Sequence, residues 1–396
     1  MTRINEYVGN FTFHPVGHGL FYSGIIKNLE TENQFSFIYD CGGENKEKVI
    51  DAISNSNLPE EIDLLIISHF HADHIKGVTE LKKNHKIKKV VLPYLDETSK
   101  IIYIANLKDE ADREMNDELI RFIKNSQTFF GEGTEVFYIS EESENTNRQE
   151  EINNNLDKEF DFFWSNYREK KESEKVENEK GKYIFIGNPI YKSSIWTFIF
   201  FMPKKSSDFK ELEIFFNEEK ITCDNAIDQW DKIIRKMVKL KLNNNVSNLI
   251  CAHGPTNILN IKNIRINKFF YPYFFFLHRF YFDEVGFQFL TGDAEIDNQE
   301  SFLEKYKDYL NKSILFQIPH HGSKINWHDW FSNYQPFCYL WPLTHNSNHK
   351  YKNGIFPSAT FSYIAPYSVT EIESTKLGIQ MFFFREHPKT NKKETN

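Results

Sequence analysis

The sequence predicts a layered α/β protein, and three observations indicate this class. Asp63–Ser68 is an apolar run typical of a strand that is buried on both faces. A helix-like stretch at Val78–Lys83 separates it from a second strand at Lys89–Pro93, which is the order of a βαβ unit. Short strands precede this unit and return after Leu249, so both ends of the chain are expected to contribute to the layers.

The remaining elements follow from local composition. Three short strands separated by glycine and polar turns come first, over Phe11–Val16, Tyr22–Lys27 and Phe35–Tyr39. A helix is expected over Glu47–Ser54, before the βαβ unit. The later strands are expected at Leu249–Ala252, Phe287–Leu290, Ile314–Ile318, Phe337–Trp341 and Ile379–Phe384, with helices between them.

A shift in composition divides the chain into three parts. Residues 144–182 are rich in Glu, Asn and Lys, which is typical of a solvated helix or a mobile insertion. We therefore expect residues 1–99 and 246–396 to form the two halves of the main fold. Residues 100–245 are expected to form a charged, partly helical insertion or subdomain between them.

Charge and cysteine content exclude several classes of protein. The 48 Lys and Arg against 56 Asp and Glu give a net charge of −8, which excludes a general attraction to nucleic acid but not a local basic groove. The 4 cysteines form no CxxC pair, so a disulfide scaffold is not expected and a reducing cytoplasm is the simplest compartment. The aromatic stretches 183–202 and 269–282 are interrupted or too short to cross a membrane, and we expect no membrane association.

The densest group of chemically active side chains follows the strand Asp63–Ser68 directly. His69 and His71 point the same way in extended backbone and can bind one metal ion together. Asp73 and His74 follow where the chain turns into a helix, and they can face a second ion. Imidazole and carboxylate ligands suit zinc, manganese or iron. The alternative is that Asp73 only caps a helix and the histidines are polar loop residues.

This His-x-His-x-Asp-His segment resembles the signature of the metallo-β-lactamase fold superfamily. The resemblance implies a four-layer αββα sandwich with a binuclear metal site at one edge of the sheets. Two further segments occur in the order that the family shows. Ile38–Gly43 resembles its early acidic motif, and Phe289–Glu295 resembles its strand-Gly-Asp motif, in which Asp293 would bridge both metal ions.

Other segments resemble one subgroup of this family. Pro319–Ser323 and Val16–Gly19, together with Thr291–Glu295, are similar to the soluble domain of the competence protein ComEC and to phosphorylcholine esterases. Both groups are associated with phosphodiester substrates. The resemblance therefore implies a phosphodiester substrate for this chain.

The same resemblance assigns roles to the residues of these segments. His320 and His321 would belong to the active site, on the second metal ion, the scissile phosphate or both. Gly322 and Ser323 would add hydrogen bonds to the substrate. His18 would line the substrate pocket or, alternatively, satisfy a turn.

The last two metal ligands are less well defined by the sequence. His253 ends a strand before Asp293 and is expected to be the third histidine on the first metal ion. In some branches of the family the final ligand lies in an Asn-x-Tyr-Gly-His-Pro segment, but here Phe356 precedes the proline. The final ligand is therefore expected to be His320 or, second, His349, with His345 and His321 also open.

These residues predict a hydrolase with two divalent metal ions, zinc or manganese, that cleaves phosphodiester bonds. A nucleic acid is the expected substrate, and a role in anti-phage defence follows from the resemblance alone. Asp73 would orient the attacking water, while His320 and His321 would neutralise charge on the phosphate. The alternatives are a hydrolase of a thioester, a lactone or a cyclic nucleotide, and a non-catalytic component of a larger complex that docks through residues 100–245.

Overall fold

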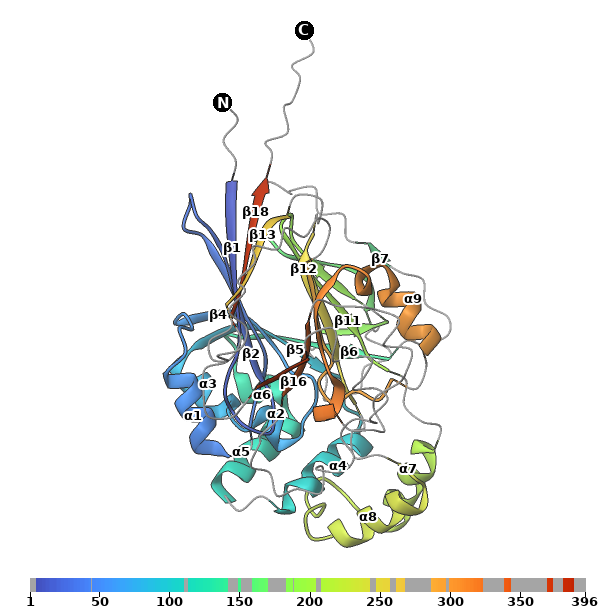
Figure 1. The fold of residues 1–396 in the computed structure, drawn as a ribbon. Helices are drawn as coiled ribbons and strands as arrows, with labels where there is room; N and C mark the ends of the chain where they lie inside the picture. The colour runs from blue at the N-terminus through green and yellow to red at the C-terminus, as the bar shows by residue number, and fades with distance from the viewer. Residues whose placement is uncertain are drawn as a thin grey trace.

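The chain forms two β-sheets that face each other, with helices on their outer faces (Figure 1). The computed structural model describes residues 5–43, 45–109, 113–141, 149–150, 159–169, 183–187, 189–203, 208–242, 247–256, 261–267, 286–296, 299–322, 338–342, 369–372 and 380–387. In this part of the chain no helix is long and apolar enough to cross a membrane.

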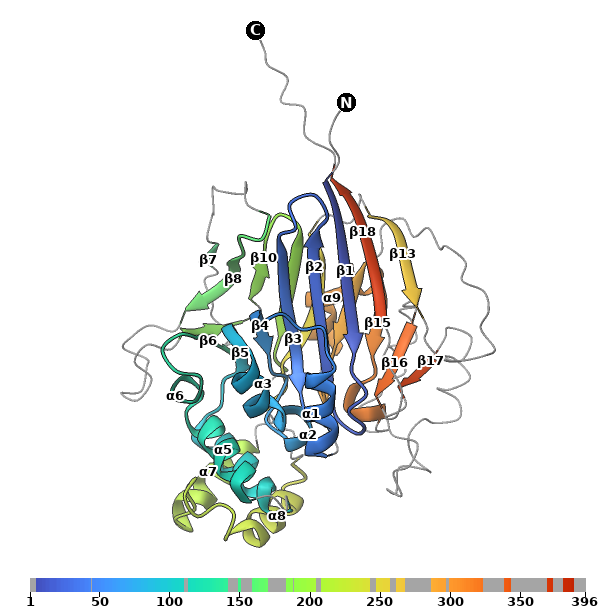
Figure 2. The ribbon, with the colours of Figure 1, turned by 90° about the vertical axis from the view of Figure 1, so that its left-hand side faces the viewer.

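The first sheet carries the N-terminal strands (Figure 2). In spatial order it contains β13 (Ile261–Asn267), β18 (Gln380–His387), β1 (Asn5–Phe13), β2 (Phe21–Asn28), β3 (Gln34–Cys41), β4 (Glu61–Ile66), β5 (Lys86–Pro93), β6 (Glu135–Ser140) and β9 (Tyr183–Ile186). Strands β3, β4, β5, β6 and β9 are parallel, as the predicted βαβ unit requires.

The second sheet is built from later segments. It contains β7 (Gln149–Glu150), β8 (Phe163–Glu169), β10 (Ile190–Lys192), β11 (Trp196–Phe201), β12 (Ile250–Pro255), β14 (Phe287–Leu290), β15 (Ser313–Gln317), β16 (Cys338–Pro342) and β17 (Val369–Ile372). Strand β8 also pairs with β9, so it joins the two sheets. Strands β14 to β17 are parallel, and the loops after β14 and β15 therefore leave the sheet at the same edge.

Helices cover both outer faces. The first sheet is accompanied by α1 (Lys46–Ser54), α2 (Ala72–Ile75), α3 (Val78–Asn84), α4 (Glu97–Asn106), α5 (Arg113–Lys124), α6 (Ser126–Phe130), α7 (Phe209–Glu218) and α8 (Trp230–Lys239). Helix α9 (Gln299–Leu310) buries Phe302 and Tyr306 against the second sheet. Short 3₁₀ helices lie at Leu107–Asp109 and Pro319–Gly322.

An aromatic core fills the space between the sheets. Phe11 and Phe37 of the first sheet contact each other with ring centroids 6.1 Å apart, and Phe37 meets Phe198 of the second sheet edge to face at 4.9 Å. Because each sheet also packs against helices on its other face, the chain has four layers. The predicted α/β class with an αββα sandwich is confirmed.

Residues 100–245 do not form a unit apart from the sheets. This range supplies β6 and β9 to the first sheet and β8, β10 and β11 to the second. Its strand β11 (Trp196–Phe201) is buried along its whole length. Helices α7 and α8 pack on α4 at the outer face. Most of the charge-rich range 144–182 lies outside the described residues.

Candidate metal centre

The His-x-His-x-Asp-His segment begins in the loop after β4 and ends in helix α2. Asp73 lies in the first turn of α2, and its carbonyl oxygen accepts a hydrogen bond of 3.2 Å from the amide of Leu20. Gly42 packs so closely on this turn that a Cβ atom there would lie 2.3 Å from the same carbonyl oxygen. The loop is thus held by the backbone of the strands beside it.

Two groups of side chains around Asp293 have the arrangement of metal ligands. His69, His71 and Asp293 form one group, while Asp73, His74 and Asp293 form the other; within each group the ligand atoms lie within 4.8 Å of one another. Asp293 Oδ1 lies 3.3 Å from His74 Nε2, and Asp293 Oδ2 lies 3.7 Å from His69 Nε2. The two oxygens of one buried carboxylate therefore face the two groups separately.

A buried carboxylate from β3 fixes how His69 and His74 are oriented. Asp40 Oδ2 accepts a hydrogen bond from His74 Nδ1 (2.8 Å) and another from Ser68 Oγ (2.6 Å). Because the Ser68 hydroxyl hydrogen goes to Asp40, its oxygen accepts from His69 Nδ1, 2.9 Å away. Both imidazoles therefore carry a proton on Nδ1 and direct Nε2 toward Asp293, which is the orientation of metal-binding histidines.

The electrostatics of the two histidines differ. Burial, assisted by the neighbouring His74, lowers the pKa of His69 well below its ordinary value. Burial acts in the same direction on His74, but the carboxylates of Asp293, Asp73 and Asp40 outweigh it and raise the pKa of His74. This concentration of carboxylates makes the pocket attractive to a cation.

The loop that carries Asp293 is positioned from the next strand. Gln317 at the end of β15 accepts on Oε1 a hydrogen bond of 3.1 Å from the Thr291 amide, and its carbonyl accepts from Thr291 Oγ1 at 3.0 Å. Gly292 has φ +54°, and a Cβ atom there would lie 2.7 Å from Ser68 Oγ. His320 follows β15; its amide donates to Gly292 O at 3.0 Å, and its Nε2 lies 3.6 Å from Asp293 Oδ2.

The residues present fit a divalent metal ion. His69 Nε2 is fully buried and has no hydrogen-bond partner in the described part of the chain, which is a costly arrangement for a polar atom unless it binds a ligand. The donor set combines imidazole nitrogen with carboxylate oxygen, which suits zinc and manganese. His71 is held by the Asn106 amide, whose Nδ2 lies 3.3 Å from His71 Nε2.

His253 does not join these groups, contrary to the expectation from sequence. It lies on β12 with its ring in the aromatic core between the sheets, 4.8 Å from the Phe37 ring. Tyr22 donates its hydroxyl hydrogen to Gln288 Oε1 (2.8 Å), and its oxygen accepts from His253 Nε2 (3.0 Å). Burial lowers the pKa of His253 to about 3, so this histidine is a neutral core residue.

A short segment before β12 lies beside the histidine loop instead. The Leu249 amide donates to Ser68 O (2.7 Å), and Tyr103 Oη accepts from the Ser247 amide and donates to the Ser247 carbonyl. The Tyr103 ring meets the His71 ring edge to face at 5.2 Å. Asn248 Oδ1 is buried and has no hydrogen-bond partner among the described residues. No spacing pattern in the sequence marks these residues, because backbone contacts bring them to the site.

The predicted substrate-binding residues and the alternative metal ligands lie partly or wholly outside the described residues. His18 is half-buried in the loop that ends at Leu20. His321 and Gly322 follow His320 in the 3₁₀ helix, and their side-chain positions are not described. Ser323, His345 and His349 lie outside the described residues, so their predicted roles remain predictions.

This fold places two groups of potential metal ligands around one carboxylate, and comparisons with known proteins show which family part of the chain is similar to. Residues 26–114, which include Asp40 and the histidine loop, match the family model of the metallo-beta-lactamase superfamily. The match shows that this part of the chain is similar to the metallo-beta-lactamase superfamily, and sheets flanked by helices are consistent with that fold.

Comparison with solved structures gives matches that include the crystal structure of the metallo-beta-lactamase fold protein YhfI from Bacillus subtilis. The sequence identity is 13% and the TM-score is 0.21; the match covers 46% of this chain and 58% of that chain. No curated protein matches the chain.

Proposed function

We propose that the protein is a hydrolase that uses two divalent metal ions to cleave phosphodiester bonds, and that its substrate is a nucleic acid. The observation that carries the proposal is the position of Asp293 between two ligand groups, one facing each carboxylate oxygen. A bridging carboxylate of this kind suits two cations about 3.5–4 Å apart, the spacing that two-metal phosphodiester cleavage uses.

The chain's own residues divide into two metal-holding sets. His69 and His71 would hold the first ion with Asp293, while Asp73 and His74 would hold the second with the same carboxylate. Zinc or manganese bound there would polarise the phosphate and lower the pKa of a water molecule. The Asp40–Ser68 hydrogen bonds keep the Nε2 lone pairs of His69 and His74 available for this purpose.

The remaining residues would act on the substrate. The Asp73 carboxylate is 27% exposed and would accept a hydrogen bond from the attacking water, fixing its direction. His320 is 26% exposed, and its Nε2 lies 3.6 Å from Asp293 Oδ2, the oxygen that faces the His69 group. We assign it to the scissile phosphate, where it would donate a proton to the leaving oxygen, and its role as a ligand of the second ion stays a prediction. We assign phosphate binding to His321, Gly322 and Ser323, and pocket lining to His18.

The net charge of −8 supports a second candidate, a hydrolase of a small substrate such as a cyclic nucleotide, thioester or lactone, because an acidic protein gains little from a long polyanion. A role in anti-phage defence belongs to the proposal on the strength of the sequence resemblance alone. A protein partner would bind through residues 100–245, whose charge-rich part would be the docking surface.

The test is metal-dependent hydrolysis by the purified protein and its Asp73→Ala/His74→Ala variant. The substrates are single-stranded DNA, double-stranded DNA, RNA and bis(p-nitrophenyl) phosphate, with Mn²⁺ or Zn²⁺ supplied. Asp228→Ala, at an exposed position in the turn before α8, serves as the matched control. Cleavage by wild type and control that disappears in the double variant supports the proposal. No cleavage of any of these substrates by a protein that still binds two ions would refute it.

A further inference from the structure

The two ligand groups around Asp293 are assembled from both sheets. The segment from His69 to His74 follows β4 of the first sheet, whereas Asp293 follows β14 of the second sheet. The distance between the carboxylate and the histidines therefore depends on how the two sheets are held together at this edge. Metal ligands must be placed to within about 0.5 Å, so this edge needs a contact of defined geometry.

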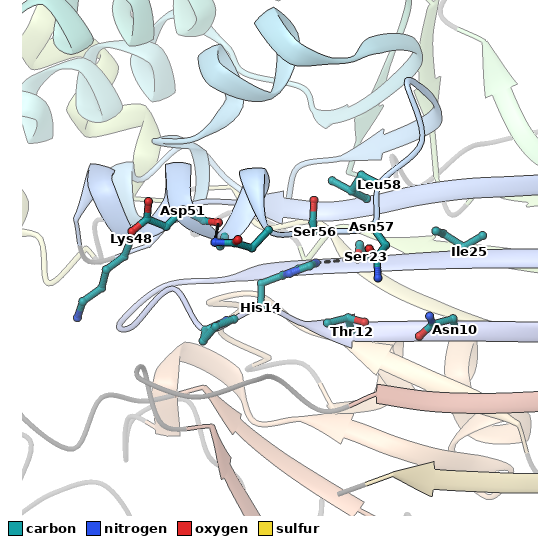
Figure 3. A pocket seen from close by; sticks show the side chains of 13 residues that line it. Asn10, Thr12, His14, Ser23, Ile25, Lys48, Asp51, Ser56, Asn57 and Leu58 are labelled. Carbon is teal, nitrogen blue, oxygen red and sulfur yellow. Dashed lines mark hydrogen bonds between the residues drawn. The ribbon is translucent and has the colours of Figure 1, made fainter. Parts of the chain in front are cut away.

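A hydrogen bond that crosses between the sheets would supply this geometry. Ring contacts in the core fix positions less sharply, because the hydrophobic effect is non-directional. Hydrogen bonds within one sheet do not set the distance between the sheets. His14, for example, lines a cavity of about 310 Å³ beside α1, and its Nε2 lies 2.8 Å from Ser23 Oγ (Figure 3). That contact joins the end of β1 to β2, and both strands belong to the first sheet.

Tyr39 makes a contact that does cross between the sheets. It lies near the end of β3 in the first sheet and is fully buried. Its hydroxyl donates to the carbonyl oxygen of Leu249 at 2.8 Å and to that of Leu290 at 3.1 Å, so one hydrogen is shared by two acceptors. Leu290 ends β14, and Leu249 directly precedes β12, which pairs with β14. The Tyr39 hydroxyl therefore joins the first sheet to two neighbouring segments of the second.

The same hydroxyl lies against the loop that carries Asp293. Leu290 is the last residue of β14, and the loop begins directly after it. A Cβ atom on Gly292 would lie 3.3 Å from Tyr39 Oη, so the loop and the hydroxyl approach each other closely. Fixing the Leu290 carbonyl therefore fixes where the Asp293 loop starts.

The residue after Tyr39 acts on the histidines from the same strand end. The Asp40 carboxylate accepts from Ser68 Oγ at 2.6 Å and from His74 Nδ1 at 2.8 Å. Burial, and next the charge of Asp40, raises the pKa of Tyr39 well above its ordinary value, so the hydroxyl keeps its hydrogen at neutral pH. The end of β3 thus holds the histidines through Asp40 and the Asp293 loop through Tyr39.

We propose that Tyr39 is a positioning residue of the metal centre, whose hydroxyl holds the Asp293 loop where one carboxylate can bind two ions. It acts through the carbonyls of Leu249 and Leu290. Without its hydrogen, two buried carbonyl oxygens lose a donor and the loop can shift relative to the histidines. The inference rests on the metal centre of the proposed function but not on the substrate, because it concerns metal binding.

The test is calorimetric titration of the full chain with Zn²⁺, for the wild type, Tyr39→Phe and Tyr306→Phe. Tyr306 is the matched control, because it is also fully buried and its hydroxyl also donates to two backbone carbonyls, those of Ile199 (3.0 Å) and Ile250 (3.3 Å). It lies on α9 and packs on the second sheet, so its hydroxyl does not join the two sheets. We expect Tyr39→Phe to lower the metal affinity about tenfold and Tyr306→Phe to retain the affinity of the wild type.

Two further measurements separate positioning from stability. Urea unfolding shows whether both variants are folded, and we expect them to lose similar amounts of stability because each loses the same kind of hydrogen bond. Tyr39→para-aminophenylalanine places N–H donors where the hydroxyl was, so it should restore most of the metal affinity that Tyr39→Phe loses.

The outcomes distinguish this inference from the proposed function. Equal metal affinities for Tyr39→Phe and the wild type, an equal loss of affinity in Tyr306→Phe, a failed rescue or an unfolded Tyr39→Phe chain would each overturn the positioning role alone. A wild type that binds two ions but cleaves no phosphodiester would refute the proposed function alone. A wild type that binds no metal ion would refute both.

Discussion

The hydrogen bonds of Asp40 provide the sharpest test of how the metal centre is organised. Asp40 accepts from the Ser68 amide at 2.6 Å through Oδ1, and from Ser68 Oγ and His74 Nδ1 through Oδ2. In Asp40→Asn one of these oxygens becomes an NH₂ group. Since Asp40 has φ +57° and asparagine tolerates that region equally well, the substitution leaves the backbone unstrained.

Either orientation of the new amide leaves a buried donor without an acceptor. With NH₂ in the place of Oδ2, both Ser68 Oγ and His74 Nδ1 lose their acceptor; with NH₂ in the place of Oδ1, the Ser68 amide loses it. One unsatisfied buried group costs about 1–3 kcal/mol, which is the expected loss in free energy of unfolding. His74 would also be free to move its proton to Nε2, and the expected loss in metal affinity is about 10–100-fold.

The assay is metal affinity by competition with a chromogenic chelator, together with urea unfolding. Asp63→Asn is the matched control, because Asp63 likewise accepts from the amide and hydroxyl of one serine, Ser36, but it is 20% exposed and also binds Lys88. We expect the control to retain the metal affinity of the wild type. Equal metal affinities for Asp40→Asn and the wild type would refute the orienting role of Asp40.

Three further predictions follow from other parts of the structure. Ser68→Ala removes the acceptor of His69 Nδ1, so calorimetric titration with Zn²⁺ should show a loss of metal affinity of about tenfold. Unchanged affinity would show that the Ser68 hydroxyl does not orient His69 for metal binding. Gly292→Ala places a side chain at φ +54° and should lower the melting temperature and the metal content, whereas Gly133→Ala, where a side chain meets nothing within 4 Å, should leave both unchanged. His253 has a folded pKa of about 3, below the unfolded value of 6.5, so its contribution is complete above pH 6.5 and is lost as the pH falls. Urea unfolding should show that His253→Gln loses about 2 kcal/mol less free energy of unfolding than the wild type does between pH 7.5 and pH 5, and equal losses would contradict the burial of a neutral ring.

The sequence predicted the candidate metal ligands that directly follow a strand. The strand Asp63–Ser68 ends at the site edge, so His69 to His74 had to lie there, and β14 and β15 deliver Asp293 and His320 to the same place. These ligands follow strands directly, and the direction of a parallel strand fixes where its loop emerges. Spacing along the chain is sufficient evidence for such residues.

His253, which the sequence predicted as a metal ligand, lies in the aromatic core instead and shows what spacing along the chain cannot predict. Strand β12 is buried on both faces, so its sequence has no polar side to indicate which way each residue points. Ala252 faces α9 and His253 faces the aromatic core, a choice made by the pairing of β12 with β11 and β14. Asp40 and Ser68 meet only because β3 and β4 are neighbours, which spacing along the chain does not reveal.

The central claim is that two metal ions share Asp293, and anomalous X-ray diffraction from crystals grown with Zn²⁺ or Mn²⁺ tests it most directly. The account predicts two anomalous peaks about 3.5–4 Å apart, one beside His69 and His71 and the other beside Asp73 and His74, with Asp293 between them. No peak, or a single peak that Asp293 does not contact, would contradict it.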